Sequence, residues 1–157
     1  QDNEISWLDW NLLEKNRELF EFFKFMIDYR FRHPVIRKKL PDAVCGMDPL
    51  HAHNINAEDM TIPKDAKTLS VSFAGHDTER GRDDLVYISV NPYWENVSIT
   101  LPRLNPPNAW FLSVTTWGDE NNRYCYPEGR EPQIDHEFTL RPRSVAVFTG
   151  RLINDQD

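Results

Sequence analysis

Histidines and paired carboxylates are the side chains of this sequence that could bind a metal ion or transfer a proton. His51 and His53 are separated by one residue, so a strand would place both imidazoles on one face, as a zinc site requires. No third ligand stands at a matching spacing, which favours ordinary loop histidines. The sequence therefore predicts no metal site.

The remaining polar candidates also favour structural roles. Asp83-Asp84 and Asp119-Glu120 are expected to be solvated turn residues, and His33, before Pro34, is expected to partner a helix end. His76 and His136 are isolated in the sequence. No GxSxG, HExxH, GxGxxG or phosphate-loop motif occurs. We therefore predict no catalytic residue and no cofactor.

Aromatic residues are a second kind of candidate, because their rings can stack on sugars. Six of them lie in or beside expected turns: Tyr93, Trp94, Trp110, Trp117, Tyr124 and Tyr126. They either close the ends of a β-domain, since aromatic side chains bury large areas, or form a carbohydrate-contacting surface. Trp94 and Trp117 are the candidates for glycan contact.

Composition excludes several classes of partner. The 157 residues carry a net charge of −7, which argues against nucleic acid and anionic membranes. No apolar run approaches the roughly 18 residues of a membrane span. Cys45 and Cys125 lie far apart and lack a CxxC spacing, so we expect both to be inert free thiols. We expect a cytoplasmic, reducing compartment.

One helix is predicted from Leu12 to Arg32, starting near Asp9 or Asn11 and ending before Pro34. At about 100° per residue its apolar side chains cover roughly 240°, and charged residues fill one narrow stripe. A helix lying on one sheet needs an apolar stripe of only about 100° or somewhat more. We therefore expect a second body to cover its other side.

The rest of the sequence predicts β-structure. Residues 38–67 lack periodicity and are expected to form an irregular loop. From Leu69 apolar residues alternate with polar ones in five to eight short strands, with Leu69, Val71 and Phe73 on one face. Val86, Ile88 and Val90 are expected to share a face, as are Val97, Ile99 and Leu101, and Trp110, Leu112 and Val114. We therefore predict a mainly β protein, an antiparallel β-sandwich preceded by a long amphipathic helix.

Several stretches resemble isoamylase-type and glycogen-operon debranching enzymes of the α-amylase superfamily. They are QDNEISWLDW at residues 1–10, LFEFFKFMIDYRFRHPVIRK at 19–38, DAKTLSVSFAG at 65–75, DDLVYISVNPYWENVSITLP at 83–102 and LRPRSVAVF at 140–148. They are spread over most of the chain, from residue 1 to residue 148.

The resemblance implies a fold and a division of labour. Residues 1–40 would be the tail of a catalytic (β/α)₈ barrel, a loop plus its last helix, followed by a connecting loop at 41–67. Residues 68–157 would be the C-terminal sandwich, of the all-β type found in α-amylases. Such enzymes hydrolyse α-1,6 linkages in glycogen, starch or limit dextrin with two barrel carboxylates. Both would lie upstream of residue 1.

The resemblance also implies partners. The chain would stabilise the barrel without being catalytic, and would meet α-glucan as part of the parent enzyme. Gln1, Asp2 and Asn3 would follow the last barrel strand and line the substrate cleft, or only brace their loop. The alternatives are a non-catalytic glycan-binding β-domain and a protein-interaction domain that self-associates through its helix.

Overall fold

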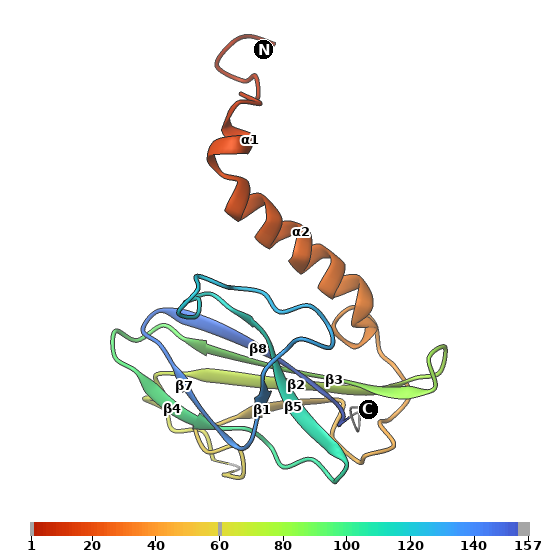
Figure 1. Ribbon diagram of the computed structural model, residues 1–157. Coiled ribbons are helices and arrows are strands. Elements are labelled where there is room, and N and C mark those ends of the chain that lie inside the picture. Colours follow the sequence, from red (N-terminus) through yellow and green to blue (C-terminus); the bar gives the residue numbers. More distant parts are fainter. Residues whose placement is uncertain (1, 60, 154–157) are drawn as a thin grey trace.

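The computed structural model of the protein describes residues 2–59 and 61–153. Two helices, α1 (Leu12–Lys15) and α2 (Arg17–Arg32), come first and are followed by a 3₁₀ turn, η1 (Pro34–Ile36). The strands are β1 (Leu50–His53), β2 (Leu69–Asp77), β3 (Arg82–Asn91), β4 (Val97–Thr100), β5 (Asn108–Thr115), β6 (Gln133–Ile134), β7 (Glu137–Leu140) and β8 (Ser144–Leu152). Figure 1 shows the helices as a rod that projects beyond the sheets, with the N-terminus at its far end.

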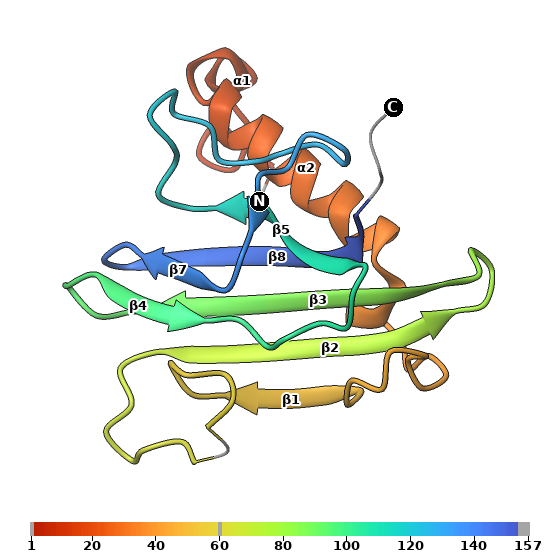
Figure 2. The ribbon, with the colours of Figure 1, turned by 60° about the horizontal axis from the view of Figure 1, so that its bottom comes forward.

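The strands form two antiparallel sheets. The larger sheet has six strands in the order β1-β2-β3-β8-β5-β6, and the smaller pairs β4 with β7. Figure 2 shows β4 and β7 in front of β3 and β8, and side chains of both sheets share one core, so the two sheets form a sandwich-like pair of layers. The prediction of a mainly β protein with antiparallel sheets is confirmed. Residues 2–59 and 61–153 hold no helix long and apolar enough to cross a bilayer.

The main core lies between the two sheets. Leu85, Tyr87 and Phe148 of the large sheet meet Ile99 and Leu140 of the small one, and each of these side chains is at most 1 % exposed. Burying such a side chain stabilises the fold by roughly 1.5–3 kcal/mol, so this contact holds the layers together.

A second core lies between α2 and the opposite face of the large sheet. Tyr29 of α2 is 2 % exposed and packs with Val86 and Val147. Its hydroxyl lies 2.9 Å from the Thr149 hydroxyl, which lies 2.7 Å from that of Ser113. The helix is therefore a third layer, fixed by apolar packing and by one buried hydroxyl chain.

The strand periodicity is largely confirmed, with one correction. Trp110 and Leu112 of β5 face the main core as predicted, but Val114 packs in the second core under α2. A register shift between Leu112 and Val114 opposite β8 is the reason, because one extra residue turns the following side chain to the other face.

Three boundaries differ from the predictions. The helix is interrupted at Asn16 (φ −113°, ψ 28°), although it ends at Arg32, before Pro34, as predicted. The expected irregular loop contains β1, which pairs with β2. Asp83 and Asp84, which were expected in a turn, belong to a strand, because β2 continues to Asp77 and β3 begins at Arg82.

Candidate functional site

The most prominent surface feature is an uncovered apolar face on α1 and α2, called here the outer helix face. Its side chains are between 38 % and 60 % exposed: Leu12, Leu13, Leu19, Phe20, Phe23, Ile27 and Phe31. Soluble monomers rarely expose a contiguous apolar patch of this kind unless it binds something. The outer helix face is therefore the first candidate for a binding surface, and it agrees with the wide apolar arc seen in the sequence.

The large sheet adds a second uncovered apolar area beside the helix. Phe73 of β2 packs in the core under α2, so Leu69 and Val71, at alternate positions, face the same side. Leu50, paired with Phe73, shares this side and is 63 % exposed, and Leu69 is 50 % exposed. The intervening Ser70 is 1 % exposed and faces the main core. We call Leu50, Ala52, Leu69 and Val71 the outer sheet face.

A buried polar contact anchors the end of α2 to β3. The His33 Nδ1–H donates to Asp84 Oδ1 over 2.6 Å, and the Val35 backbone N–H donates to Asp84 Oδ2 over 3.0 Å. His33 and Asp84 are each 7 % exposed. Asp84 was expected to be a solvated turn residue, and this prediction was wrong because its partners lie about fifty positions earlier in the chain.

Asp83 anchors the next segment in the same way. Its carboxylate accepts the backbone N–H groups of Val44 (2.9 Å) and Cys45 (2.8 Å) and the His76 Nδ1–H (2.9 Å). Burial raises the pKa of Asp83, but the hydrogen bonds from His76, Val44 and Cys45 outweigh this and hold the pKa below its usual range. Asp83 was also expected to be solvated and His76 to be isolated, and the structure corrects both.

The two histidines considered as metal ligands and the two cysteines are all buried or partly buried. The His51 and His53 rings lie 4.7 Å apart on β1, and His53 Nε2 lies 2.8 Å from the Ser72 hydroxyl. In residues 2–59 and 61–153, no group of three or more His, Cys, Asp or Glu side chains could hold a metal ion. Cys45 and Cys125 are free thiols, and burial raises the pKa of both, which disfavours the nucleophilic thiolate.

Of the residues expected beside a substrate cleft, Asp2 and Asn3 are described and Gln1 lies outside the described residues. Asp2 accepts the indole N–H of Trp7, and the Asn3 side chain accepts the Ile5 backbone N–H over 3.1 Å. These bonds are local to the N-terminal segment, at the end of the helical rod away from the sheets (Figure 1).

Four of the six candidate aromatics are either buried or exposed, and the other two, Tyr93 and Tyr124, are partly buried. Trp110 and Tyr126 are 3 % and 5 % exposed and help to fill the main core, whereas Trp94 and Trp117 are 66 % and 53 % exposed. Trp94 lies against Tyr93, with ring centroids 4.1 Å apart. The Tyr93 carbonyl accepts the Arg143 N–H and the Thr116 N–H donates to the Val145 carbonyl, each over 2.9 Å. Both exposed indoles therefore flank the start of β8.

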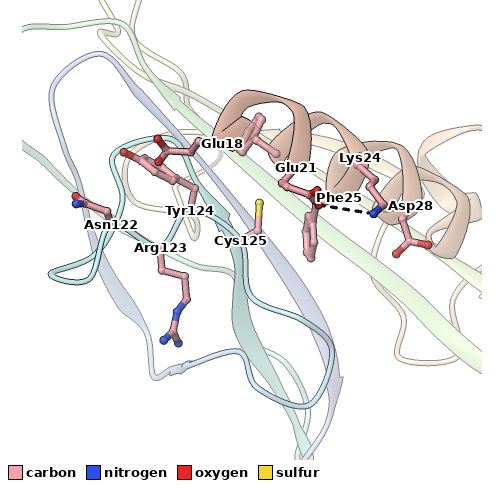
Figure 3. Close-up of a pocket in the computed structure, with 10 residues that line it drawn as sticks. Glu18, Glu21, Lys24, Phe25, Asp28, Asn122, Arg123, Tyr124 and Cys125 are labelled. Atoms are coloured by element: carbon pink, nitrogen blue, oxygen red, sulfur yellow. Dashed lines mark ion pairs between the residues drawn. The ribbon is translucent and has the colours of Figure 1, made fainter. Parts of the chain in front are cut away.

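A groove of about 520 Å³ separates the charged side of α2 from the segment at residues 122–125 (Figure 3). Glu21, Lys24 and Asp28 line it from the helix, and Arg123 and Tyr124 line it from the loop. Glu21 and Lys24 form an ion pair at 3.7 Å. Charged helix residues were visible in the sequence as a stripe, but the opposing wall comes from a loop about a hundred residues later and was not predicted.

Comparison with known proteins gives a partial match. No family model matches the chain. Proteins named glycogen operon protein GlgX homolog, from Mycobacterium tuberculosis and Mycobacterium bovis, are 41 % identical to it over 39 residues. The match covers 25 % of this chain and 5 % of each relative, so it spans a small part of their length. Along one quarter of its length, the chain is similar to these glycogen-operon proteins.

Proposed function

We propose that this chain is the C-terminal part of a cytoplasmic α-glucan debranching hydrolase of the isoamylase type. Support comes from the stretches that resemble such enzymes, from the 41 % identity over 39 residues to glycogen-operon proteins, and from the antiparallel β-domain that follows a long helix. The parent enzyme hydrolyses α-1,6 linkages in glycogen, starch or limit dextrin. Its carboxylate pair belongs to the barrel, and the chain itself is non-catalytic.

In this proposal α1 and α2 form the last barrel helix, and the β-domain covers one of its sides. The observation that carries the proposal is the outer helix face, where residues such as Phe20, Phe23 and Ile27 are about half exposed while Tyr29 is buried against the sheet. A barrel that packs on this face completes the burial of the helix. The adjoining outer sheet face extends the same contact.

The energetic consequence follows from burial. Seven apolar side chains form the outer helix face, and completing the burial of one Phe or Leu is worth up to roughly 1.5–3 kcal/mol. Even after a discount for their present partial burial, the contact stabilises the barrel by several kcal/mol. In this proposal Asp2 and Asn3 either line the substrate cleft on the barrel side or only brace their loop.

Truncation of the parent enzyme tests this role. A parent that ends before Leu69 loses the sandwich but keeps the helix, and we expect it to unfold at a markedly lower temperature and to lose debranching activity with it. A truncated parent that stays soluble, active and equally heat-stable would refute the stabilising role.

A second candidate function is glycan binding by the β-domain through Trp94 and Trp117. Their exposures of 66 % and 53 % favour it, because an aromatic ring must be open to stack on a sugar. Maltooligosaccharide titration of the chain tests it by intrinsic tryptophan fluorescence. A saturable change that is lost on Trp94→Ala or Trp117→Ala supports this function, and an unchanged signal at millimolar sugar removes it.

A further inference from the structure

The groove between α2 and residues 122–125 has an apolar floor and a polar rim. Phe22 and Phe25 of the helix and Cys125 of the loop form the floor. Its volume of about 520 Å³ lies in the range of small-molecule sites, which is roughly 300–1,000 Å³. Figure 3 shows the Cys125 sulfur between the two walls, below the helix.

Several polar groups at this rim have no partner within the described part of the chain. The Glu18 carboxylate, the Tyr124 hydroxyl and the Asn122 amide form no hydrogen bond or ion pair there. Glu21, in contrast, pairs with Lys24, and Asp28 pairs with Arg32 over 2.7 Å. The Glu18 carboxylate can accept hydrogen bonds, and the Tyr124 hydroxyl and the Asn122 amide can each donate and accept them.

The groove stays open when the outer helix face is covered. At 100° per residue, the helix residues that line the groove and those of the outer helix face are centred roughly 150° apart around the axis. A body packed on Phe20, Phe23 and Ile27 therefore leaves Glu18 and Glu21 accessible. The groove adjoins the outer helix face only at Leu19, which lines a neighbouring hollow with Phe22 and Tyr124, and its other helix residues lie away from the proposed barrel contact.

We propose that this groove binds a segment of neutral α-glucan, as a site separate from the catalytic centre. The aromatic rings of Phe25 and Tyr124 suit the C–H faces of sugars, and the unpaired carboxylate, amide and hydroxyl suit their hydroxyls. The rim carries carboxylates at Glu18, Glu21 and Asp28 and cations at Lys24 and Arg123, a near balance that disfavours polyanions. That the ligand is α-linked is inferred from the proposed function. That it is a neutral sugar is inferred from the residues of the groove.

Cysteine protection tests this site with an internal control. Cys125 lines the groove, while Cys45 lines a different groove beside His76 and Asp83. The 157-residue chain is treated with iodoacetamide at pH 9, with and without maltoheptaose at about 10 mM, a concentration chosen for a millimolar dissociation constant. Mass spectrometry follows the alkylation of each thiol. We expect several-fold slower alkylation of Cys125 and an unchanged rate at Cys45.

Variants make the outcome specific. Glu18→Gln replaces an exposed side chain and keeps the fold, and together with Tyr124→Ala it is expected to reduce the protection of Cys125. Trp94→Ala, at the other candidate sugar surface, is expected to leave it intact.

Equal rates with and without sugar, equal protection of both thiols, or protection that survives both groove variants would overturn the proposal. Equal protection by cellohexaose would overturn the α-glucan assignment. The heat stability of the truncated parent is measured independently of these results. The proposed stabilising role and the proposed glucan site can therefore fail separately.

Discussion

The His33 imidazole lies 2.6 Å from the Asp84 carboxylate, between Nδ1 and Oδ1, and both residues are buried. This contact fixes the end of α2 to the middle layer of the fold. The second Asp84 oxygen accepts the Val35 N–H, so one carboxylate holds both the end of the helix and the start of η1. The direction in which the helical rod leaves the sheet therefore depends on this carboxylate.

Asp84→Ala should destabilise the protein strongly. It leaves the His33 Nδ1–H and the Val35 N–H buried without an acceptor, which costs about 2–4 kcal/mol in the free energy of unfolding. Urea denaturation followed by circular dichroism measures this. Asp65→Ala is the matched control, because Asp65 is exposed, and it should change stability by less than about 0.5 kcal/mol. Similar values for both variants would contradict the anchor.

The outer helix face should make the chain self-associate when nothing else covers it. Phe23 is 58 % exposed and Ile27 is 57 % exposed, so Phe23→Lys with Ile27→Lys removes apolar surface at little cost to the fold. Light scattering across protein concentrations should show association for the unmodified chain and a monomer for the double variant. Lys24→Ala, on the charged side of the same helix, should associate like the unmodified chain. A monomer at every concentration before substitution would argue against this face as a contact surface.

The sequence predicted those helices and strands that can be recognised from their own residue pattern, without knowledge of what they pack against. Alternation of apolar residues identified the long strands, and the wide apolar arc of residues 12–32 identified the helix and its uncovered side. Pro34 marked the helix end, because proline disfavours helical geometry in the residue before it. These features depend on local geometry alone.

What could not be predicted depends on contacts between distant residues. Asp84 was expected in solvent because its partners, His33 and Val35, lie far away in the sequence. The strand β1 has the sequence Leu-His-Ala-His, which alternates over only four residues and holds a single large apolar side chain, and its pairing with β2 defines it. Val114 was assigned to the wrong face because a register shift is decided by the neighbouring strand β8.

Alkylation of Cys125 should depend on pH in a way that reports its environment. Burial raises its pKa from 9.0 to about 11, so near neutral pH the thiolate is about 100-fold rarer than for an ordinary thiol. The native alkylation rate should rise about tenfold per pH unit and level off near pH 11, whereas in urea it should level off near pH 9. A native plateau near pH 9 would contradict burial of this thiol.

The same shift predicts a change of stability in alkali. Between pH 9 and about pH 11 the unfolded chain has lost the Cys125 proton while the folded chain retains it. The folded state binds more protons in this window, so this thiol's contribution to stability is complete below pH 9 and declines as the pH rises to about 11. Cys125→Ser should flatten that part of the profile of urea midpoint against pH, and an unchanged slope would exclude this thiol as its source.

A side chain at Gly75 of β2 should destabilise the protein, because the loop before β1 crosses directly over this residue. A Cβ atom at Gly75 would lie 2.6 Å from Leu40 Cβ, and the neighbouring His76 N–H donates to the Pro41 carbonyl over 2.8 Å, which holds the two segments together. Gly75→Ala should therefore cost about 1–3 kcal/mol in the free energy of unfolding. Leu40→Gly removes the clashing atom, so the cost of Gly75→Ala should be smaller in the Leu40→Gly background than in the unmodified chain. Additive costs in this double-mutant cycle would show that the loop does not lie on β2 as described.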